Sequence, residues 1–498
     1  MYQVPAGALG LLTLIAISSG CDGDSGEPRS TTVLPGARNK TSSAASPGSE
    51  TPGATPARPV PQPAHRDFPL SGLVTGTRLR VRALPRPEAP VWGWLRRGAA
   101  VRLKPDRRRS ATCSSGWHEL DPRGWVCLGE GIALRSESEP QLESEPQLES
   151  GLRSPIEPAY DYYFVKEQAV PEYHRLPSRS EQRAALRFSD RYLQLQRDDT
   201  HAAARLLAGE LEQEPERPAV VHGLLQRGFF VAAVGVEARE ARHFVRTVRG
   251  HYVKRASLLP RKGSTFKGMV LDKGNTLPIA WAVRGARPLS LRDSDAGAPE
   301  LVTDPQARPI ARQTRVPWLG RRRIGGQVFH ELEGGRYLRF WFVAVAEEVT
   351  PPRGVGPGEP WLHVDLSRQT LVLYQGAAPV FATLISSGLA GHETPQGLFT
   401  IRAKHVTATM SDLGPDLGDD RYRIEDVPFA QYFQGSIAVH GAFWHGGFGL
   451  PRSHGCINLS PADARYVFER TWPQVPRGWH GVASAGAPSR ASKVLISR

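Results

Sequence analysis

The sequence predicts a mostly β protein that is divided into several small domains. Most structured segments are short runs in which apolar and polar residues alternate, which is the pattern of strands packed on one face. Two stretches of low complexity, at 22–66 and 136–155, separate these runs into distinct parts. The length of 498 residues suits about three domains of ordinary size. Helical patterns are confined to a few segments.

Residues 1–20 have the features of an export signal. Residues 8–17 are almost continuously apolar, and small residues then lead to Cys21. A cysteine at this point resembles the bacterial lipoprotein pattern, which implies cleavage before Cys21 and its lipidation; a plain cleaved signal peptide is the alternative. The apolar run is too short to span a bilayer. We therefore expect an exported protein of the periplasm or cell envelope, anchored to the membrane through its lipid.

The segments that flank the first domain are expected to be linkers. Residues 22–66 are rich in Ser, Thr, Gly, Pro and Ala, so they cannot bury enough apolar surface to fold and predict a disordered tether. Residues 136–155 contain "SEPQLE" twice in tandem and predict a low-complexity linker.

Residues 67–135 predict a small β domain, because short alternating segments are separated there by turn residues. The segments at 79–82, 93–98 and 124–126 resemble the "LNVR", "GxLxxG" and "GWV" strands of bacterial SH3-like domains, which often bind peptidoglycan peptides. A generic barrel that only spaces the chain from its anchor is the alternative. The middle region, 156–355, predicts two helical segments followed by SH3-like repeats of unassigned role.

The four cysteines point to different roles. In an exported protein, cysteine pairs tend to oxidise. Cys113 and Cys127 would close a loop of about 15 residues, and such a disulfide contributes about 3 kcal/mol. With Cys21 lipidated, Cys456 is left as a single free thiol.

Residues 357–482 predict a further domain of antiparallel strands with one helix. Three strands are expected within 361–388 and another at 436–443, with a polar loop at 405–424. The segment 460–473 predicts a helix, because Ser460 suits the N-cap, Pro461 the first helical position and Asp463 the first turn. Residues 483–498 are expected to be a C-terminal tail.

The loop "RSHGCINLS" at 452–460 carries the candidate chemistry. Strand 436–443 holds His440, and Cys456 follows 16 residues later, after a glycine-rich loop that can fold back. An ordinary thiol is mostly protonated at neutral pH and needs a base. We expect His440 to accept its proton while its second nitrogen bonds the Gly441 carbonyl. The Gly455 and Cys456 amides would stabilise a tetrahedral oxyanion.

These residues resemble the active-site signature of the L,D-transpeptidase catalytic domain family, a histidine followed by a glycine-rich loop and "[S/T]HGCxN". "TPQGLF" at 394–399 also resembles the family's "TPxGxF" strand. The resemblance implies a β-sandwich with one covering helix, preceded here by small SH3-like barrels. It further implies that Cys456 is the nucleophile and His440 the base, that His454 supports the site, and that Ser453 and Asn458 shape it.

The implied reaction is a ping-pong acyl transfer on peptidoglycan stem tetrapeptides. Cys456 takes the acyl group as a thioester, terminal D-Ala leaves, and an amine accepts the acyl group, which gives a 3–3 cross-link or a tethered protein. No cofactor and no metal are expected. Hydrolysis by an L,D-carboxypeptidase and a non-catalytic wall-binding lipoprotein remain alternatives.

Several residues near the motif have two interpretations. Asn458, Arg452, Trp444 and Tyr422 are candidate substrate contacts, but Trp444 and His445 also suit a packed loop, and Arg452 a plain surface position. Tyr422 with 411–420 is a candidate lid. A zinc site formed by His440, His445, His454 and Cys456 is the alternative chemistry. The net charge of +14 suits an anionic partner or reflects composition alone; without a recognition motif, we expect no nucleic-acid binding.

Overall fold

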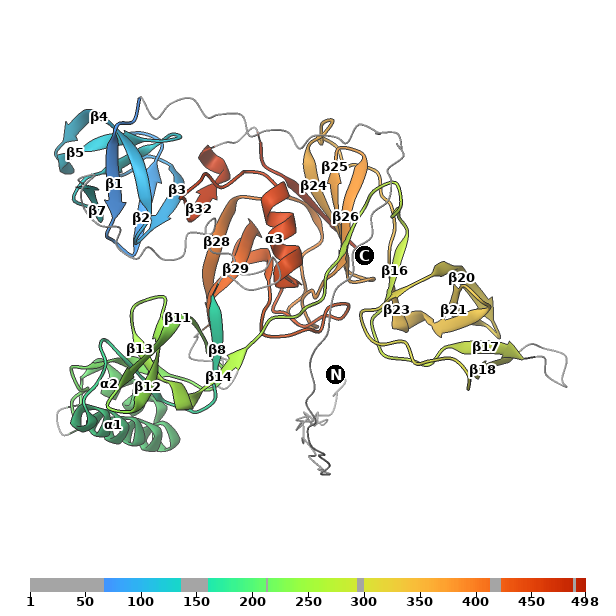
Figure 1. Cartoon of the computed structure of the whole chain (residues 1–498), viewed down its shortest axis with the longest axis horizontal. Coiled ribbons are helices and arrows are strands. Elements are labelled where there is room, and N and C mark those ends of the chain that lie inside the picture. Colours follow the sequence, from blue (N-terminus) through green and yellow to red (C-terminus); the bar gives the residue numbers. More distant parts are fainter. Residues whose placement is uncertain (1–66, 136–159, 212–213, 293–299, 413–421, 487–489) are drawn as a thin grey trace, which may run out of the picture. The chain divides into compact units, whose positions relative to one another are not determined.

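The computed structural model describes residues 67–135, 160–211, 214–292, 300–412, 422–486 and 490–498. Strands dominate these residues and three α-helices accompany them, which confirms the predicted mostly β class (Figure 1). The predicted signal, Cys21, the tether at 22–66 and the linker at 136–155 lie outside the described residues. No described helix combines the length and the apolar character that a transmembrane span requires.

The first domain is a small antiparallel β structure. Its strands are β1 (Leu70–Val74), β2 (Arg78–Arg82), β3 (Val91–Arg96), β4 (Ala100–Ser110), β5 (Cys113–Leu120), β6 (Trp125–Cys127) and β7 (Ile132–Arg135). Strand β1 pairs with β4 and β7, while β2 pairs with β3 and β6. Alternate residues of these strands, such as Val81, Leu95 and Leu103, are buried in one core. The SH3-like identity of this domain remains a prediction.

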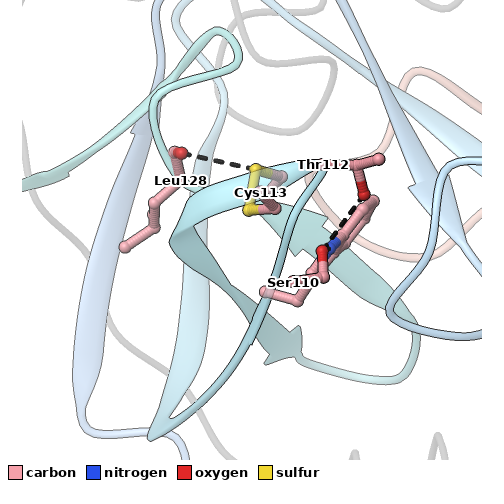
Figure 2. The surroundings of a disulfide bond; sticks show 6 residues. Ser110, Thr112, Cys113 and Leu128 are labelled. Atoms are coloured by element: carbon pink, nitrogen blue, oxygen red, sulfur yellow. Dashed lines mark hydrogen bonds between the residues drawn. A yellow bond between two sulfur atoms is a disulfide. The ribbon is translucent and has the colours of Figure 1, made fainter.

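A disulfide joins Cys113 at the start of β5 to Cys127 at the end of β6, as predicted (Figure 2). The two Cα atoms are 6.0 Å apart, and both side chains are buried beside Trp117. The Trp117 indole N–H donates to Ser110 Oγ at 3.2 Å. The pair therefore links neighbouring antiparallel strands inside a small apolar cluster.

The first part of the middle region combines strands with two helices. Its elements are β8 (Asp161–Val165), β9 (Val170–Tyr173), α1 (Arg179–Asp198), α2 (Thr200–Ala208), β10 (Val221–Leu225), β11 (Phe230–Arg239), β12 (Arg242–Thr247), β13 (Tyr252–Lys254) and β14 (Leu258–Arg261). Both predicted helical segments are confirmed. Ser178 and Glu181 form a capping box at the start of α1, and Gly209, in a left-handed conformation, ends α2. Strand β9 pairs with β10 on one side and β13 on the other.

The second part of the middle region contains short strands. They are β15 (Met269–Val270), β16 (Ile279–Ala282), β17 (Leu289–Arg292), β18 (Glu300–Thr303), β19 (Arg315–Val316), β20 (Trp318–Ile324), β21 (Gln327–Leu332), β22 (Arg336–Arg339) and β23 (Val343–Ala346). Strands β17, β18 and β20–β22 form one sheet, and β16, β19 and β23 form another. The expectation of SH3-like repeats in the middle region remains a prediction.

The C-terminal domain has two sheets with one helix. Its elements are β24 (Pro360–Asp365), β25 (Thr370–Gln375), β26 (Ala378–Leu384), β27 (Gly397–Thr400), β28 (Ala403–Asp412), β29 (Tyr422–Gln434), β30 (Ile437–Gly441), β31 (Ile457–Leu459), α3 (Pro461–Arg470), β32 (Gly481–Ala483) and β33 (Lys493–Ser497). Side chains of β24 and β25 meet those of β29 and β30 in one core, which Val467 and other residues of α3 complete. In Figure 1, α3 lies against β29.

Two expectations for this domain are wrong. Residues 483–498 are not a tail, because β33 pairs in parallel with β24 and antiparallel with β27 and so lies inside the sheet. The physical reason is the apolar alternation of Val494 and Ile496, which are both buried. The described parts of the predicted loop at 405–424, which are 405–412 and 422–424, belong to strands, since β28 pairs with β29 from Ala403 to Asp412.

The start of α3 follows the prediction, with one difference. Ser460 Oγ accepts from the Asp463 N–H at 3.2 Å, and Pro461 is the first helical residue. The Asp463 carboxylate, however, accepts from Gly268 N–H at 2.9 Å and from Thr383 Oγ1 at 2.6 Å. This side chain therefore links the helix start to β26 and to the segment before β15.

Candidate active site

His440 and Cys456 lie on one face of two neighbouring strands. Strands β30 and β31 pair in parallel, with Val439 opposite Ile457 and His440 opposite Asn458. Side chains alternate along a strand and register partners share a face. Cys456 directly precedes β31 and falls beside Ala438, so it lies on the face of His440, two positions away. The register therefore places the imidazole and the thiol, which are 16 residues apart in the sequence, on one face of this pair of strands.

The imidazole of His440 is held in a state that can accept a proton. Its side chain is buried, and Nδ1 lies 3.2 Å from the Gly441 carbonyl oxygen, as predicted. Burial lowers the pKa of His440 to about 4, so the ring is neutral at neutral pH. Because Nδ1–H donates to the carbonyl, the free lone pair is on Nε2. The Trp444 ring stacks on this imidazole at a centroid distance of 5.7 Å.

The thiol of Cys456 is protonated at rest. Burial raises its pKa above the ordinary value, although a backbone hydrogen bond from Ala438 opposes this shift. The sulfur lies 3.9 Å from the Ser436 carbonyl oxygen, a weak S–H donor contact. Such a thiol becomes a strong nucleophile only when a base removes its proton during attack.

Ser453 shapes the loop around the thiol. Its hydroxyl donates to the Cys456 carbonyl oxygen at 2.5 Å and accepts from the Gly455 N–H at 3.1 Å. Gly455 has φ of +109°, a conformation that side chains other than glycine rarely adopt. The Gly455 amide is thus engaged by Ser453 in this structure, and its expected part in stabilising an oxyanion remains a prediction. Among the described residues, no partner is recorded for the Cys456 amide, which remains available.

Thr394 of the "TPQG" segment supports the same loop. Its hydroxyl accepts from Gly388 N–H and donates to the Gly455 carbonyl oxygen, each at 2.9 Å. The side chain is buried, so both backbone groups depend on this hydroxyl. The two sequence motifs therefore act as one structural unit, a relation that their separate positions in the sequence do not reveal.

Asn458 and the loop residues Trp444 and His445 are mainly positioned by packing. The Asn458 amide lies 3.0 Å from His445 Nε2, and His445 Nδ1 accepts from Gly447 N–H. The neighbouring Phe443 stacks on Tyr162 of β8 at 3.6 Å, and Trp444 lies 6.4 Å from Phe230 of β11, both measured between ring centroids. The middle region therefore packs against the loop that follows His440.

The remaining predicted site residues lie at the edge of the site. His454 is exposed and stacks on Tyr422 at 5.5 Å, with His392 at 4.6 Å on another side. Arg452 is exposed, and its backbone N–H donates to the Ser387 carbonyl oxygen. Positions 411 and 412 end β28, and the rest of the candidate lid, 413–420, lies outside the described residues.

One residue on the reactive face was missed by sequence reasoning. Tyr432 of β29 is the register partner of Ala438, so it lies on the same face as Cys456. Burial raises the pKa of Tyr432 to about 12, and the nearby Cys456 adds to this shift. No signal marks Tyr432 in the sequence, because the sequence analysis predicts no strand at this position and so cannot say which way its side chain points.

The zinc alternative at this site receives no support. Within the described part of the chain, the cluster of three or more potential metal ligands that the structure brings together is His174, His222 and His251, all in the middle region. The structure does not bring together ligand atoms of the four proposed zinc residues, His440, His445, His454 and Cys456, in such a cluster.

Comparison with known proteins agrees with this site. Residues 359–478 match the model of the YkuD family, the L,D-transpeptidase catalytic domain. No curated protein sequence matches the chain.

Similar solved structures include an L,D-transpeptidase from Mycobacterium smegmatis (18% identity, 54% of this chain and 99% of that chain, TM-score 0.24). They also include the catalytic domain of the E. faecium L,D-transpeptidase (24% identity, 28% and 98%, TM-score 0.22) and an Ldtfm–avibactam carbamoyl enzyme (22% identity, 31% and 54%, TM-score 0.23). The chain thus spans about half the length of the Ldtfm chain. The match at residues 359–478 and the motif residues that it contains identify this segment as a member of the L,D-transpeptidase catalytic domain family.

Proposed function

We propose that the chain is an exported peptidoglycan L,D-transpeptidase that uses Cys456 as its nucleophile. The observation that carries the proposal is the shared face of His440 and Cys456 on β30 and β31. On this face, the imidazole is neutral and oriented by the Gly441 carbonyl, and the thiol is protonated and needs a base. The family match at residues 359–478 supports the same reaction class.

The first half-reaction forms the acyl-enzyme. His440 Nε2 takes the thiol proton while the sulfur attacks the carbonyl carbon at the L-centre of the diamino acid in a stem tetrapeptide. The Cys456 N–H stabilises the oxyanion that forms. The C–N bond to terminal D-Ala then breaks, and the imidazolium returns its proton to the leaving amine. The product is a thioester on Cys456 and free D-Ala.

The second half-reaction regenerates the thiol. An acceptor amine attacks the thioester carbonyl, His440 takes a proton from that amine, and the C–S bond breaks as the thiolate is reprotonated. A stem-peptide amine gives a 3–3 cross-link, and a protein lysine gives a tethered protein. Water in place of the amine gives carboxypeptidase activity from the same intermediate.

Export and anchoring complete the proposal. A disulfide between Cys113 and Cys127 suits an oxidising compartment outside the cytoplasm. We propose that Cys21 carries the lipid and that the protein resides in the periplasm or cell envelope. Labelling with a radioactive fatty acid in cells tests this; labelled wild type and unlabelled Cys21→Ala protein are expected, whereas label in both contradicts lipidation at this residue.

The central experiment follows the thioester. Purified chain and its Cys456→Ser variant are incubated with a stem tetrapeptide, and D-Ala release and intact protein mass are measured. The wild type is expected to release D-Ala and to gain the mass of the tripeptide acyl group, and the variant to do neither. Undiminished D-Ala release by the variant would refute the proposal. Analysis of the peptide products then separates joined dimers from shortened tripeptides.

A further inference from the structure

Three histidines from distant parts of the middle region meet at one end of three adjacent strands. Strand β9 lies between β10 and β13, with Tyr173 opposite both Val221 and Tyr252. His174 directly follows β9, and His251 directly precedes β13, so the register places these two residues opposite each other. Both lie on the face opposite to the buried side chain of Tyr173.

A β-bulge brings in the third histidine. The register of β10 against β9 shifts between Val221 and Gly223, which leaves His222 as the extra residue. The imidazole rings of His222 and His251 have centroids 3.9 Å apart, and the His174 ring lies 5.0 Å from that of His222. One ligand nitrogen from each of the three residues lies within 4.8 Å of the others.

A buried carboxylate orients this cluster. Glu172 of β9 is 1% exposed, and its Oε1 lies 2.9 Å from His251 Nδ1. When Nδ1–H of His251 donates to this carboxylate, the lone pair of the ring is on Nε2. This carboxylate–histidine arrangement is typical of residues that support metal ligands.

The turn before β13 holds His251 in place. Its backbone N–H donates to Thr247 Oγ1 at 3.1 Å, and its carbonyl oxygen accepts from Thr247 N–H at 2.8 Å. Thr247 is itself buried. The side chains of His174 and His222 are exposed, so an ion from solution can reach them.

We propose that His174, His222 and His251 form a binding site for a divalent transition-metal ion, with Zn²⁺ as the preferred occupant. Three imidazole nitrogens suit a borderline ion such as Zn²⁺, which takes three protein ligands and leaves a fourth position for water or another group. Glu172 is the positioning residue that orients His251. This site lies in the middle region and is independent of the cysteine chemistry of residues 359–478.

Charged side chains of both signs lie near the histidine cluster. The positive charge of Arg423 interacts electrostatically with both Glu172 and His222, and it opposes a bound cation. Its guanidinium, however, donates to the buried Glu425 carboxylate at 2.6 Å. Glu425 also pairs with Arg249, whose Nε lies 3.4 Å from Oε1, so two arginines and two carboxylates meet at this place.

Zinc titration of the full chain tests the proposal. Each protein carries Cys456→Ser, so that the thiol of the transpeptidase site contributes no ligand, and is freed of metal with a chelator that is then removed. Calorimetry with ZnCl₂ and the zinc content after gel filtration measure affinity and stoichiometry. One Zn²⁺ per chain is expected, and His174→Ala or His222→Ala should weaken binding by more than about 100-fold.

Two further variants separate a metal site from histidine packing. Glu172→Gln should weaken zinc binding by about 10–100-fold without changing the stoichiometry, because it orients a ligand and is not one. His243→Ala, which removes an exposed histidine of β12, should leave binding unchanged. Circular dichroism checks that each variant is folded. Failure of the parent chain to bind Zn²⁺ at micromolar concentrations, or equal binding by His174→Ala and His222→Ala, would overturn the proposal.

Discussion

The candidate active site and the three-histidine cluster use similar side chains but are encoded in very different ways. His440 and Cys456 are 16 residues apart and belong to a contiguous stretch of loop and strand ends. His222 lies in β10, while His174 directly follows β9 and His251 directly precedes β13, so long segments of chain separate the three residues. Both sites form where neighbouring strands end side by side. Only the first leaves a compact signature in the sequence, because one loop alone carries it.

The largest effect is expected from a comparison in which one histidine of each site is replaced by glutamine. His440→Gln removes the base, and D-Ala release from a tetrapeptide should fall by about 10²–10⁴-fold. His222→Gln, in the cluster, should leave the rate within about twofold, since that residue takes no part in the proposed thiol chemistry. Rates are measured at saturating peptide, and thermal melting verifies folding. Equal losses in both variants would show that the two sites are not independent.

A second prediction concerns β33, which the sequence analysis assigned to a C-terminal tail. Val494 of β33 is fully buried between two sheet layers, so Val494→Asp places an unpaired charge in the core. We expect a loss of more than about 4 kcal/mol in the free energy of unfolding, with loss of D-Ala release. Arg498→Asp, at the exposed end of the chain, is the control and should melt as the wild type does. An unaffected Val494→Asp protein would contradict a structural role for β33.

A third prediction concerns Thr394, which supports the active-site loop from a separate segment of the sequence. Thr394→Val keeps the shape of the side chain but removes the hydroxyl that serves Gly388 and Gly455. Each backbone group left unpaired should cost about 1–3 kcal/mol of stability, measured by denaturant unfolding. D-Ala release should also decrease, because the carbonyl before Cys456 loses its support. The control, Thr400→Val, changes an exposed threonine of β27; an equal effect there would remove the special role of Thr394.

The smallest expected effect is in the pH profile of the active site. Burial lowers the pKa of His440 to about 4, so protonation should disable the base only near that pH. Lowering the pH from 7.5 to 5.5 should therefore reduce kcat/KM by less than about twofold, whereas a histidine with the ordinary value near 6.5 would give about a tenfold loss. A tenfold loss in this interval, measured with the folded protein, would show that His440 is more solvated than its buried position implies.

The sequence alone determined the mostly β class, the helices at 179–198 and 461–470, the disulfide pair and the candidate reactive residues. These features are local: alternation specifies strands, Ser178 and Ser460 specify helix starts, and His440 to Asn458 form one contiguous motif. Burial and pairing between distant segments are not local. The tertiary structure decided the place of β33 in the sheet, the engagement of the Gly455 amide by Ser453, the position of Tyr432 beside Cys456, and the meeting of His174, His222 and His251. Strand pairing sets these contacts, and pairing partners are chosen by the packing of the whole sheet, which no single segment encodes.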